Sequence, residues 1–331
     1  MKNMLKVFVP LLLLFSACTE DISQLNIETK RPAAVPAPTL FSNATKTLAG
    51  SLASASVNTN VFRFTVSHWA MAVYQDEAQY DFNTRAIPNG WWTTMYRDVI
   101  ADLRESARLI NADATLTAGE KANKLAIIDI MQVYTYSILV NTFGNVPYTE
   151  ALQPTNLFPK YDDAKTIYKD LIARLTTDVA NLSTSSENFG STDLYYGGDA
   201  AKWKKFANSL RLKLAVNISD VEPTYGLAQI QAAVTAGVIT NSDDDTKLQY
   251  LDGVPNTNPV YVDLVASGRH DFVPANTLVN KMNALSDPRS PKYFDLNTGA
   301  TTYSGGIYGA GNTYANYSKI NANLKAPAYP G

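Results

Sequence analysis

Apolar residues recur at helical spacing along most of the chain. From Thr39 to Ala55 they fall on every fourth residue, and from Trp92 to Ile110 they follow one face of a helix. Such spacing is typical of an amphipathic α-helix whose apolar side packs against neighbours. The pattern therefore predicts a mainly α protein built from helix pairs. Further helices are expected over residues 58–74, 117–143, 162–182, 199–219, 227–236 and 275–285.

The longest of these segments, residues 117–143, is apolar on nearly every side. Thr117 and Glu120 have the spacing of a capping box, which marks the start of a helix. Gly144 and Pro147 mark its end, because glycine accepts left-handed dihedral angles and proline cannot continue a helix. We expect this helix to lie in the middle of a bundle, with neighbours on several sides.

The helical pattern breaks over residues 75–90, which are polar, aromatic and rich in turn-forming residues. A loop of this length inside a helical protein is usually functional or disordered. After Val221 the pattern of apolar and polar residues changes again. Residues 246–251 suggest an edge strand, and residues 297–311 show no periodicity. The sequence therefore predicts long irregular segments beside the helices.

The first residues have the composition of a targeting signal. A short basic start precedes an apolar run that is too short to span a bilayer. The run ends in Phe-Ser-Ala-Cys at residues 15–18, which resembles a bacterial lipobox with Phe in place of the usual Leu. That resemblance implies cleavage before Cys18 and attachment of a lipid to its sulfur. The alternative is an ordinary signal peptide cut after Ala17, with Cys18 a spare thiol.

Three segments follow from this interpretation: a signal peptide at residues 1–17, a lipid-anchored flexible tether at 18–38, and one α-helical domain at 39–331. The tether is polar and contains three prolines. It begins with Thr19-Glu20-Asp21, and acidic residues at this place resemble a surface-export signal of Bacteroidetes-type bacteria. We therefore expect a lipoprotein of the outer membrane that faces outside.

The amino-acid composition argues against several classes of function. The formal net charge is -2 and no basic patch stands out, so nucleic acid is not an expected partner. Cys18 is the only cysteine, which excludes an internal disulfide and a multi-thiolate zinc site. The 19 tyrosines favour a recognition surface, because a tyrosine ring packs while its hydroxyl forms hydrogen bonds.

Three passages together resemble the SusD/RagB family of outer-membrane nutrient-binding lipoproteins. Residues 143–152 are similar to the family's "GDVPYSEAL" turn, with Asn145 in place of Asp. Residues 197–213 are similar to its "W.KFANSLRLRLA" helix, and Asp287-Pro288-Arg289 is similar to its "DPR" turn. Members usually run well past this length, so the chain resembles a member truncated at the C-terminus.

The resemblance implies a fold of tetratricopeptide-like helix pairs with an irregular, loop-rich face. It also implies a role: a surface lipoprotein that captures a glycan and delivers it to a SusC-like TonB-dependent transporter. A RagB-like peptide-binding protein of the same uptake type is the alternative. A lipid-anchored hydrolase and a scaffold lipoprotein without a ligand are further rivals.

The loop before Trp92 is the candidate ligand site. Aromatic rings stack on the C–H faces of sugars, while Asp, Asn and Arg side chains hydrogen-bond the hydroxyl rim. We interpret Trp92 and Trp69 as core residues instead. The candidate ligand-binding residues are Tyr80, Asp81, Asn83, Arg85 and Trp91.

No motif predicts catalysis, a metal or a cofactor. His68 and His270, the two histidines, lie far apart without companion residues at ligand spacing. A pair of carboxylates for glycoside hydrolysis has no supporting signature among the 30 acidic residues. The sequence therefore favours a binding protein over an enzyme.

Overall fold

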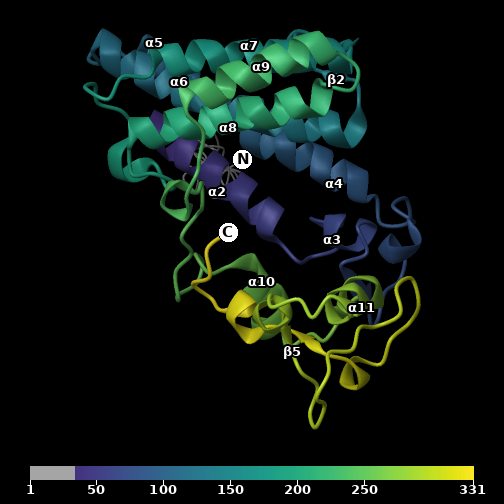
Figure 1. Cartoon of the computed structure of the whole chain (residues 1–331). Helices are drawn as coiled ribbons and strands as arrows, with labels where there is room; N and C mark the ends of the chain where they lie inside the picture. Colours follow the sequence, from purple (N-terminus) through teal and green to yellow (C-terminus); the bar gives the residue numbers. More distant parts are fainter. Residues whose placement is uncertain (1–33) are drawn as a thin grey trace, which may run out of the picture. The chain divides into compact units, whose positions relative to one another are not determined.

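The computed structural model describes residues 34–331, and its compact unit runs from Pro36 to Gly331. The predicted signal peptide and most of the predicted tether, with Cys18, lie outside the described residues. Within the compact unit, helices gather in one layer and the C-terminal third forms a loop-rich part (Figure 1). This arrangement confirms the mainly α fold of helix pairs.

The helical layer contains most of the helices that the periodicity predicted, except those expected over residues 58–74 and 275–285. Neighbouring helices in sequence pack on one another from α5 to α9, and α2 packs against α5 (Figure 1). A π-helical segment, Thr94–Ile100, joins α4 to α5 without a break. The helices are α2 Ala37–Ala53, α4 Ile87–Thr93, α5 Ala101–Ala112, α6 Ala118–Phe143, α7 Ala164–Asn181, α8 Ala200–Ile218 and α9 Pro223–Ala236.

Helix α6 is the centre of the core, as its apolar circumference predicted. Its side chains at Ile127, Ile130 and Leu139 are fully buried. The Thr117 hydroxyl accepts a hydrogen bond from the Glu120 N–H at 3.2 Å, which confirms the predicted cap. In the described part of the chain, only α6 is long and apolar enough to cross a membrane, but 67% of its most apolar window is buried. That burial is what a core helix of a bundle requires.

The turn after α6 fixes the start of α7. Gly144 has a φ of 76°, and β2 (Val146–Pro147) pairs antiparallel with β3 (Tyr161–Asp162). The Asn145 side-chain oxygen accepts a hydrogen bond from the N–H of Ala164, the first residue of α7, at 2.9 Å. The amide oxygen of Asn145 therefore accepts a bond that an Asp carboxylate could also accept, which explains why the substitution is tolerated.

The aromatic residue of the second matching passage is also structural. Trp203 is fully buried, and its indole N–H donates to the Asp193 carboxylate at 2.7 Å. Asp199 caps α8 by accepting from two backbone N–H groups. The Trp203–Asp193 hydrogen bond and the Asp199 cap both hold the loop that precedes α8 against the start of α8.

The prediction of a helix over residues 58–74 is wrong. Only α3 (Phe62–Thr65) is helical there, and the chain then forms β1 (Trp69–Met71). Ser67 has a positive φ of 55°, which ends the helix. β1 pairs antiparallel with β4 (Phe272–Pro274), and this distant partner overrides the local helical pattern.

The loop-rich part consists of short elements. The edge strand expected at 246–251 is absent; Leu248 instead exchanges two backbone hydrogen bonds with Gly331, at 2.7 and 3.0 Å. The helix predicted at 275–285 is present as α11. The remaining elements are η3 Glu77–Gln79, η5 Gly190–Thr192, η6 Ser242–Asp244, α10 Pro259–Tyr261, η7 Val262–Ala266, α11 Asn276–Ala284, α12 Ser290–Tyr293, β5 Phe294–Asp295, η8 Tyr314–Asn316, β6 Lys319–Ile320 and η9 Ala322–Lys325.

Candidate ligand-binding site

A polar pocket of about 290 Å³ opens beside the long loop that the sequence singled out. We call it the Tyr74 pocket, after the half-exposed ring at its wall. The pairing of β1 with β4 builds it, because that pairing brings the segment after β1 next to the segment before β4. Its lining residues are Ser56, Val57, Asn58, Tyr74, Arg85, Asp263, Arg269, Asp271 and Phe272.

Two guanidinium groups converge on the Tyr74 ring. The Arg85 guanidinium carbon lies 5.1 Å from the ring centroid, and that of Arg269 lies 5.8 Å from it. Both distances are within the range of a cation–π contact. Tyr74 remains 46% exposed, so its ring is held in place and still available to a ligand.

Carboxylates hold both guanidinium groups. Arg85 forms ion pairs with Asp76 at 3.0 Å and with Glu77 at 2.8 Å. Glu77 is fully buried, one of its carboxylate oxygens has no hydrogen-bond partner, and burial raises its pKa. Arg269 pairs with Asp271 at 2.6 Å, and this bond raises the pKa of Arg269. The pocket therefore presents two guanidinium groups in fixed positions, and the carboxylates paired with each of them offset the repulsion between the two positive charges.

Asp263 adds a carboxylate on a third segment. Its Oδ2 accepts hydrogen bonds from the Ser54 hydroxyl at 3.2 Å and from the Ala55 N–H at 3.1 Å. Burial raises the pKa of Asp263. These bonds attach η7 to the end of α2, so the far wall of the pocket is anchored to the helical layer.

The pocket combines the groups that recognise a hydroxyl-rich ligand. Guanidinium and amide N–H groups donate hydrogen bonds, carboxylates accept them, and the Tyr74 ring offers a flat apolar surface. Among the described residues, no three His, Cys, Asp or Glu side chains gather as a metal site would require. The geometry therefore supports binding.

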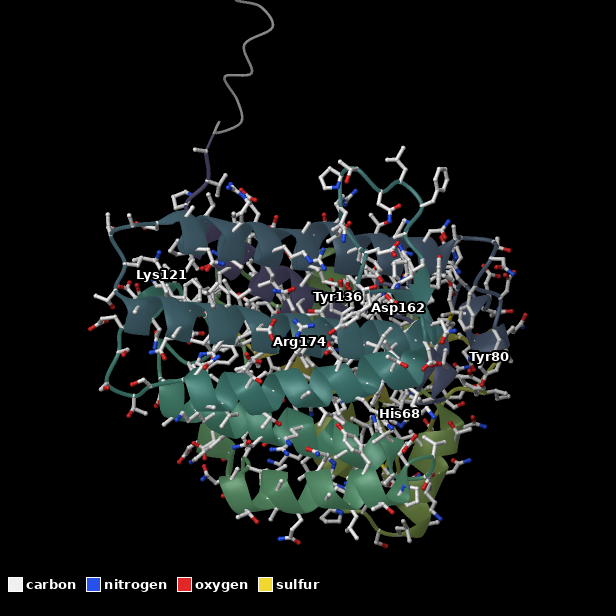
Figure 2. All side chains as sticks on the ribbon, turned by 90° about the horizontal axis from the view of Figure 1, so that it is seen from above. His68, Tyr80, Lys121, Tyr136, Asp162 and Arg174 are labelled. Atoms are coloured by element: carbon white, nitrogen blue, oxygen red, sulfur yellow. The ribbon has the colours of Figure 1, made fainter. Side chains whose placement is uncertain are left out.

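The structure divides the predicted ligand residues between two hollows. Arg85 lines the Tyr74 pocket, whereas Trp91 lines a separate apolar groove of about 430 Å³ with Phe62 and Phe82. Trp91 is only 4% exposed, and its indole N–H has no partner. Tyr80 is 59% exposed, and Figure 2 shows it at the end of the molecule. Contact of these residues with a ligand stays a prediction.

Asp81 and Asn83 have local roles in this loop. The Asp81 carboxylate accepts hydrogen bonds from the Asn83 and Thr84 N–H groups at 3.0 and 3.1 Å. These bonds lower the pKa of Asp81, the largest cause being its bond to the Thr84 hydroxyl. The pair therefore shapes a turn that presents Arg85, and contact of either with a ligand stays a prediction too.

Trp91 and Trp92 are buried the other way round from the prediction, which placed Trp92 in the core and Trp91 at a ligand site. Trp91 packs edge-on against Phe62 at 5.3 Å between ring centroids and is nearly covered. Trp92, interpreted as core, is half-buried and packs edge-on against Phe143 at 5.2 Å. On another side, Trp92 and Tyr161 line a hollow that is described below. Sequence alone does not show which member of a Trp-Trp pair faces inward at the start of a helix.

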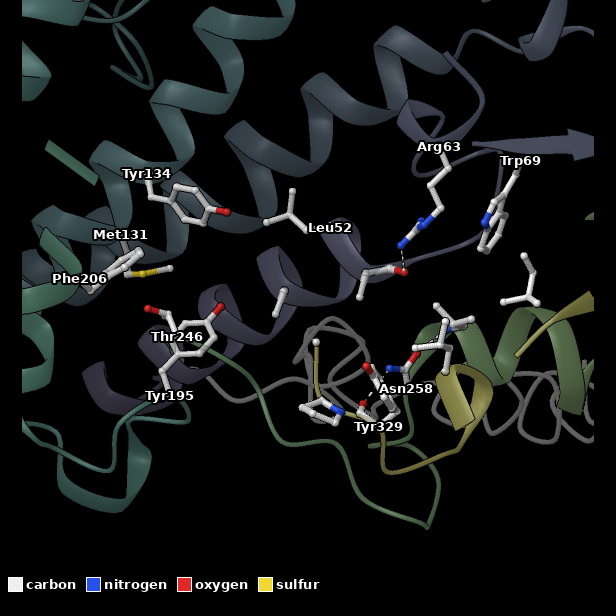
Figure 3. Close-up of a pocket in the computed structure, with 17 residues that line it drawn as sticks. Leu52, Arg63, Trp69, Met131, Tyr134, Tyr195, Phe206, Thr246, Asn258 and Tyr329 are labelled. Atoms are coloured by element: carbon white, nitrogen blue, oxygen red, sulfur yellow. Dashed lines mark hydrogen bonds between the residues drawn. The ribbon is translucent and has the colours of Figure 1, made fainter. Parts of the chain in front are cut away.

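A third cavity of about 420 Å³ lies between the helical layer and the C-terminal segment (Figure 3). Met131, Tyr134 and Phe206 line one side, and Asn258 and Tyr329 line the other. The Asn258 amide is already committed, since it donates to the Tyr329 carbonyl at 2.8 Å. The lining is mostly apolar, which fits hydroxyl-rich ligands less well than the Tyr74 pocket does.

Of the nine residues that line the pocket, sequence reasoning predicted only Arg85; the missed residues include Tyr74, Asp263, Arg269 and Asp271. Tyr74 stands directly before the predicted loop, and its position there was the one available signal. Asp263, Arg269 and Asp271 lie about two hundred residues further along the chain; the β1–β4 pairing brings Arg269 and Asp271 to the loop, and bonds to the end of α2 hold Asp263. A single sequence contains no record of that pairing.

Comparisons with known proteins agree on the architecture. A chitin-binding protein of known structure superposes with a TM-score of 0.74 at 23% identity, over 89% of this chain and 66% of that one. A SusD-like protein from Bacteroides thetaiotaomicron gives 0.70 at 23% identity, over 89% and 62%. A chitin-binding SusD homologue from Flavobacterium johnsoniae gives 0.71 at 22% identity, over 88% and 62%. The chain thus spans about two thirds of the length of these structures, and the likeness establishes the fold.

The comparison with curated proteins found no match. A family model, by contrast, covers nearly the whole chain: residues 29–331 match the SusD-like model described as "Starch-binding associating with outer membrane". This match confirms the resemblance carried by the turn after α6, the Trp203 helix and the Asp287-Pro288-Arg289 turn. The chain belongs to the SusD-like family.

Proposed function

We propose that this protein is a non-catalytic lipoprotein of the outer membrane that binds an oligosaccharide and delivers it to a SusC-like TonB-dependent transporter. The observation that carries the binding role is the Tyr74 pocket, where a half-exposed aromatic ring stands among fixed hydrogen-bonding groups. Membership of a family described as starch-binding supports the carbohydrate class.

Two of the structural relatives are named as chitin-binding proteins. Chitin and starch are both neutral glucose-type polymers whose rings offer C–H faces and equatorial polar groups. We therefore place neutral glucose-type oligosaccharides first among the ligands to be tested. A peptide ligand is the alternative within the same uptake role.

Calorimetric titration with chitooligosaccharides and maltooligosaccharides tests the proposal. Tyr74→Ala removes the ring that would stack on a sugar, and we expect affinity to fall by about tenfold. Val73→Ala is the matched control, because Val73 is 53% exposed and does not line the pocket. Equal affinity of Tyr74→Ala and the control would contradict the site. Binding of peptides with silence toward glycans would contradict the ligand class.

Three further experiments address the other parts of the proposal. Release of reducing sugar by the purified protein would contradict a non-catalytic role. Palmitate labelling that disappears in Cys18→Ala supports the lipid anchor, and unchanged labelling contradicts it. Co-purification with a TonB-dependent transporter from the membrane tests the delivery step.

A further inference from the structure

A loop with an apolar tip projects from the helical layer between β2 and β3. Phe158 is 91% exposed and Leu157 is 81% exposed, while Tyr161 at its base is 62% exposed. Phe158 is the most exposed large apolar side chain in the part of the chain that the structure describes. Isolated exposed apolar residues need no explanation, but adjacent ones at a tip mark an interaction surface. We call residues 152–161 the apolar loop.

Hydrogen bonds within the apolar loop hold its tip outward. The Glu150 carboxylate accepts from the Asn156 amide at 2.8 Å and from the Lys160 N–H at 3.2 Å. The Asn156 side-chain oxygen accepts from the Phe158 N–H at 3.2 Å. The polar groups of the loop thus bond to one another and to Glu150, while the two apolar side chains at the tip stay outside the core.

A hollow of about 420 Å³ lies beneath the tip. Trp92 and Tyr96 line it on the side of the helices, and Pro159 and Tyr161 line it on the side of the loop. The rings of Trp92 and Tyr161 are nearly parallel, with centroids 6.1 Å apart. An apolar chain can therefore enter beside the tip without displacing any polar group.

The apolar loop and the start of the compact unit are both attached to α5. The Ser106 hydroxyl donates to the Ala37 carbonyl at 2.7 Å, and the Arg104 guanidinium donates to the Ala151 carbonyl. In Figure 2, the first described residues (purple) and the apolar loop (teal) project from the same side of the helical layer. The described part of the chain therefore begins on the side that carries the apolar tip.

We propose that the apolar loop inserts into a lipid surface and orients the protein on it. An interfacial membrane contact needs Leu, Phe or Trp at the depth of the acyl chains and Lys or Arg at the headgroups. Leu157 and Phe158 supply the first, and Lys160, whose side chain is 59% exposed and lies 3.7 Å from both Glu150 and Asp162, supplies the second. The inference rests on the lipid-anchor part of the proposed function.

The length of the tether fits this arrangement. Cys18 lies nineteen residues before Ala37, a span of at most about 60 Å when extended. A tether of this length keeps the loop near the membrane without fixing its orientation, and lipidated proteins bind stably when a second membrane contact is added.

Vesicle co-sedimentation tests the inference. The mature chain carrying Cys18→Ala keeps every described residue and lacks the lipid, so the loop is the membrane contact that remains. With vesicles of phosphatidylethanolamine and phosphatidylglycerol, we expect Leu157→Asp with Phe158→Asp to lower partitioning by about tenfold. Val254→Asp is the matched control, because Val254 is 83% exposed and lies outside the loop. A Phe158→Trp variant should also show a blue-shifted emission on adding vesicles.

Two outcomes would overturn the inference: no partitioning of the Cys18→Ala chain, or equal partitioning of the double variant and the control. Loss of transporter co-purification in the double variant, with no vesicle binding by the parent, would assign the loop to a protein partner instead. Oligosaccharide affinity is measured on the same variants. Intact sugar binding with lost partitioning separates this inference from the Tyr74 pocket.

Discussion

The helical layer and the Tyr74 pocket use polar groups in opposite ways. In the helical layer, the indole N–H of Trp203 is bound by Asp193, and the side chain is fully covered. Around the pocket, Arg85 and Arg269 stand beside a ring that is 46% exposed. In the helical layer, polar contacts stabilise the buried core. In the Tyr74 pocket, they hold charged groups in place at the surface. We therefore expect stability and ligand recognition to depend on different parts of one compact unit.

The largest effect is expected from Trp203→Ala in the helical layer. The change leaves a cavity and removes one of the donors to the buried Asp193 carboxylate, which should lower the free energy of unfolding by about 3–5 kcal/mol. Urea unfolding followed by circular dichroism measures it. Val216→Ala, on an exposed position of the same helix, should cost under about 0.5 kcal/mol. Similar losses in the two variants would remove the contrast between the regions.

Arg85→Ala should act on the loop more than on the core. It leaves Glu77 buried without its cation, at a cost of about 2–3 kcal/mol. Because the ion pair lies within residues 76–85, we expect faster amide hydrogen exchange there. Amides of α6 should keep their protection. Equal loss of protection in α6 would show that the two regions unfold together.

The same contrast explains what the sequence predicted and what it did not. Helix α6 and its Thr117 cap were predicted correctly, because their determinants lie within one stretch of chain. The segment 58–74 has a helical pattern too, yet Trp69–Met71 forms a strand because β4, two hundred residues away, binds it. For the candidate site, residues 75–86 are irregular as predicted, whereas α4 begins at Ile87, inside the predicted loop. Arg269 and Asp271 depend on the long-range pairing and left no local signal.

Asp178 offers a pH test of the helical layer. Its side chain is 5% exposed, burial raises its pKa, and the neighbouring Asp129 raises it further. A raised pKa means that the folded state holds a proton that the unfolded state releases. The stability is therefore full below the unfolded pKa of about 3.9 and declines as pH rises toward the raised folded value.

Asp178→Asn should remove this decline, because an amide needs no proton. We expect a gain of about 1–2 kcal/mol at pH 8 and little gain at pH 5, measured by urea unfolding at both values. Asp220→Asn is the control, since Asp220 is exposed in the same layer. A pH profile that is parallel in the two variants would contradict the role of Asp178.

The smallest expected effect concerns the charge of the ligand. Asp263 and Asp271 line the Tyr74 pocket, and two more carboxylates pair with Arg85, so acidic groups outnumber the two guanidinium groups. Such a pocket should repel uronic acids and sulfated sugars and accept neutral ones. Asp271→Asn frees Arg269 from its ion pair, which is exposed enough to be worth only about 0–1 kcal/mol.

We therefore expect Asp271→Asn to change the affinity for neutral oligosaccharides by less than about threefold. Binding of an oligogalacturonide should rise from undetectable to weak, and it should disappear again as salt increases, because the attraction depends on exposed charges. Calorimetry at low and high ionic strength measures both ligands on the same protein. A native protein that binds the acidic sugar more tightly than the neutral one would show that Arg85 and Arg269, rather than the surrounding carboxylates, set the selectivity of the pocket.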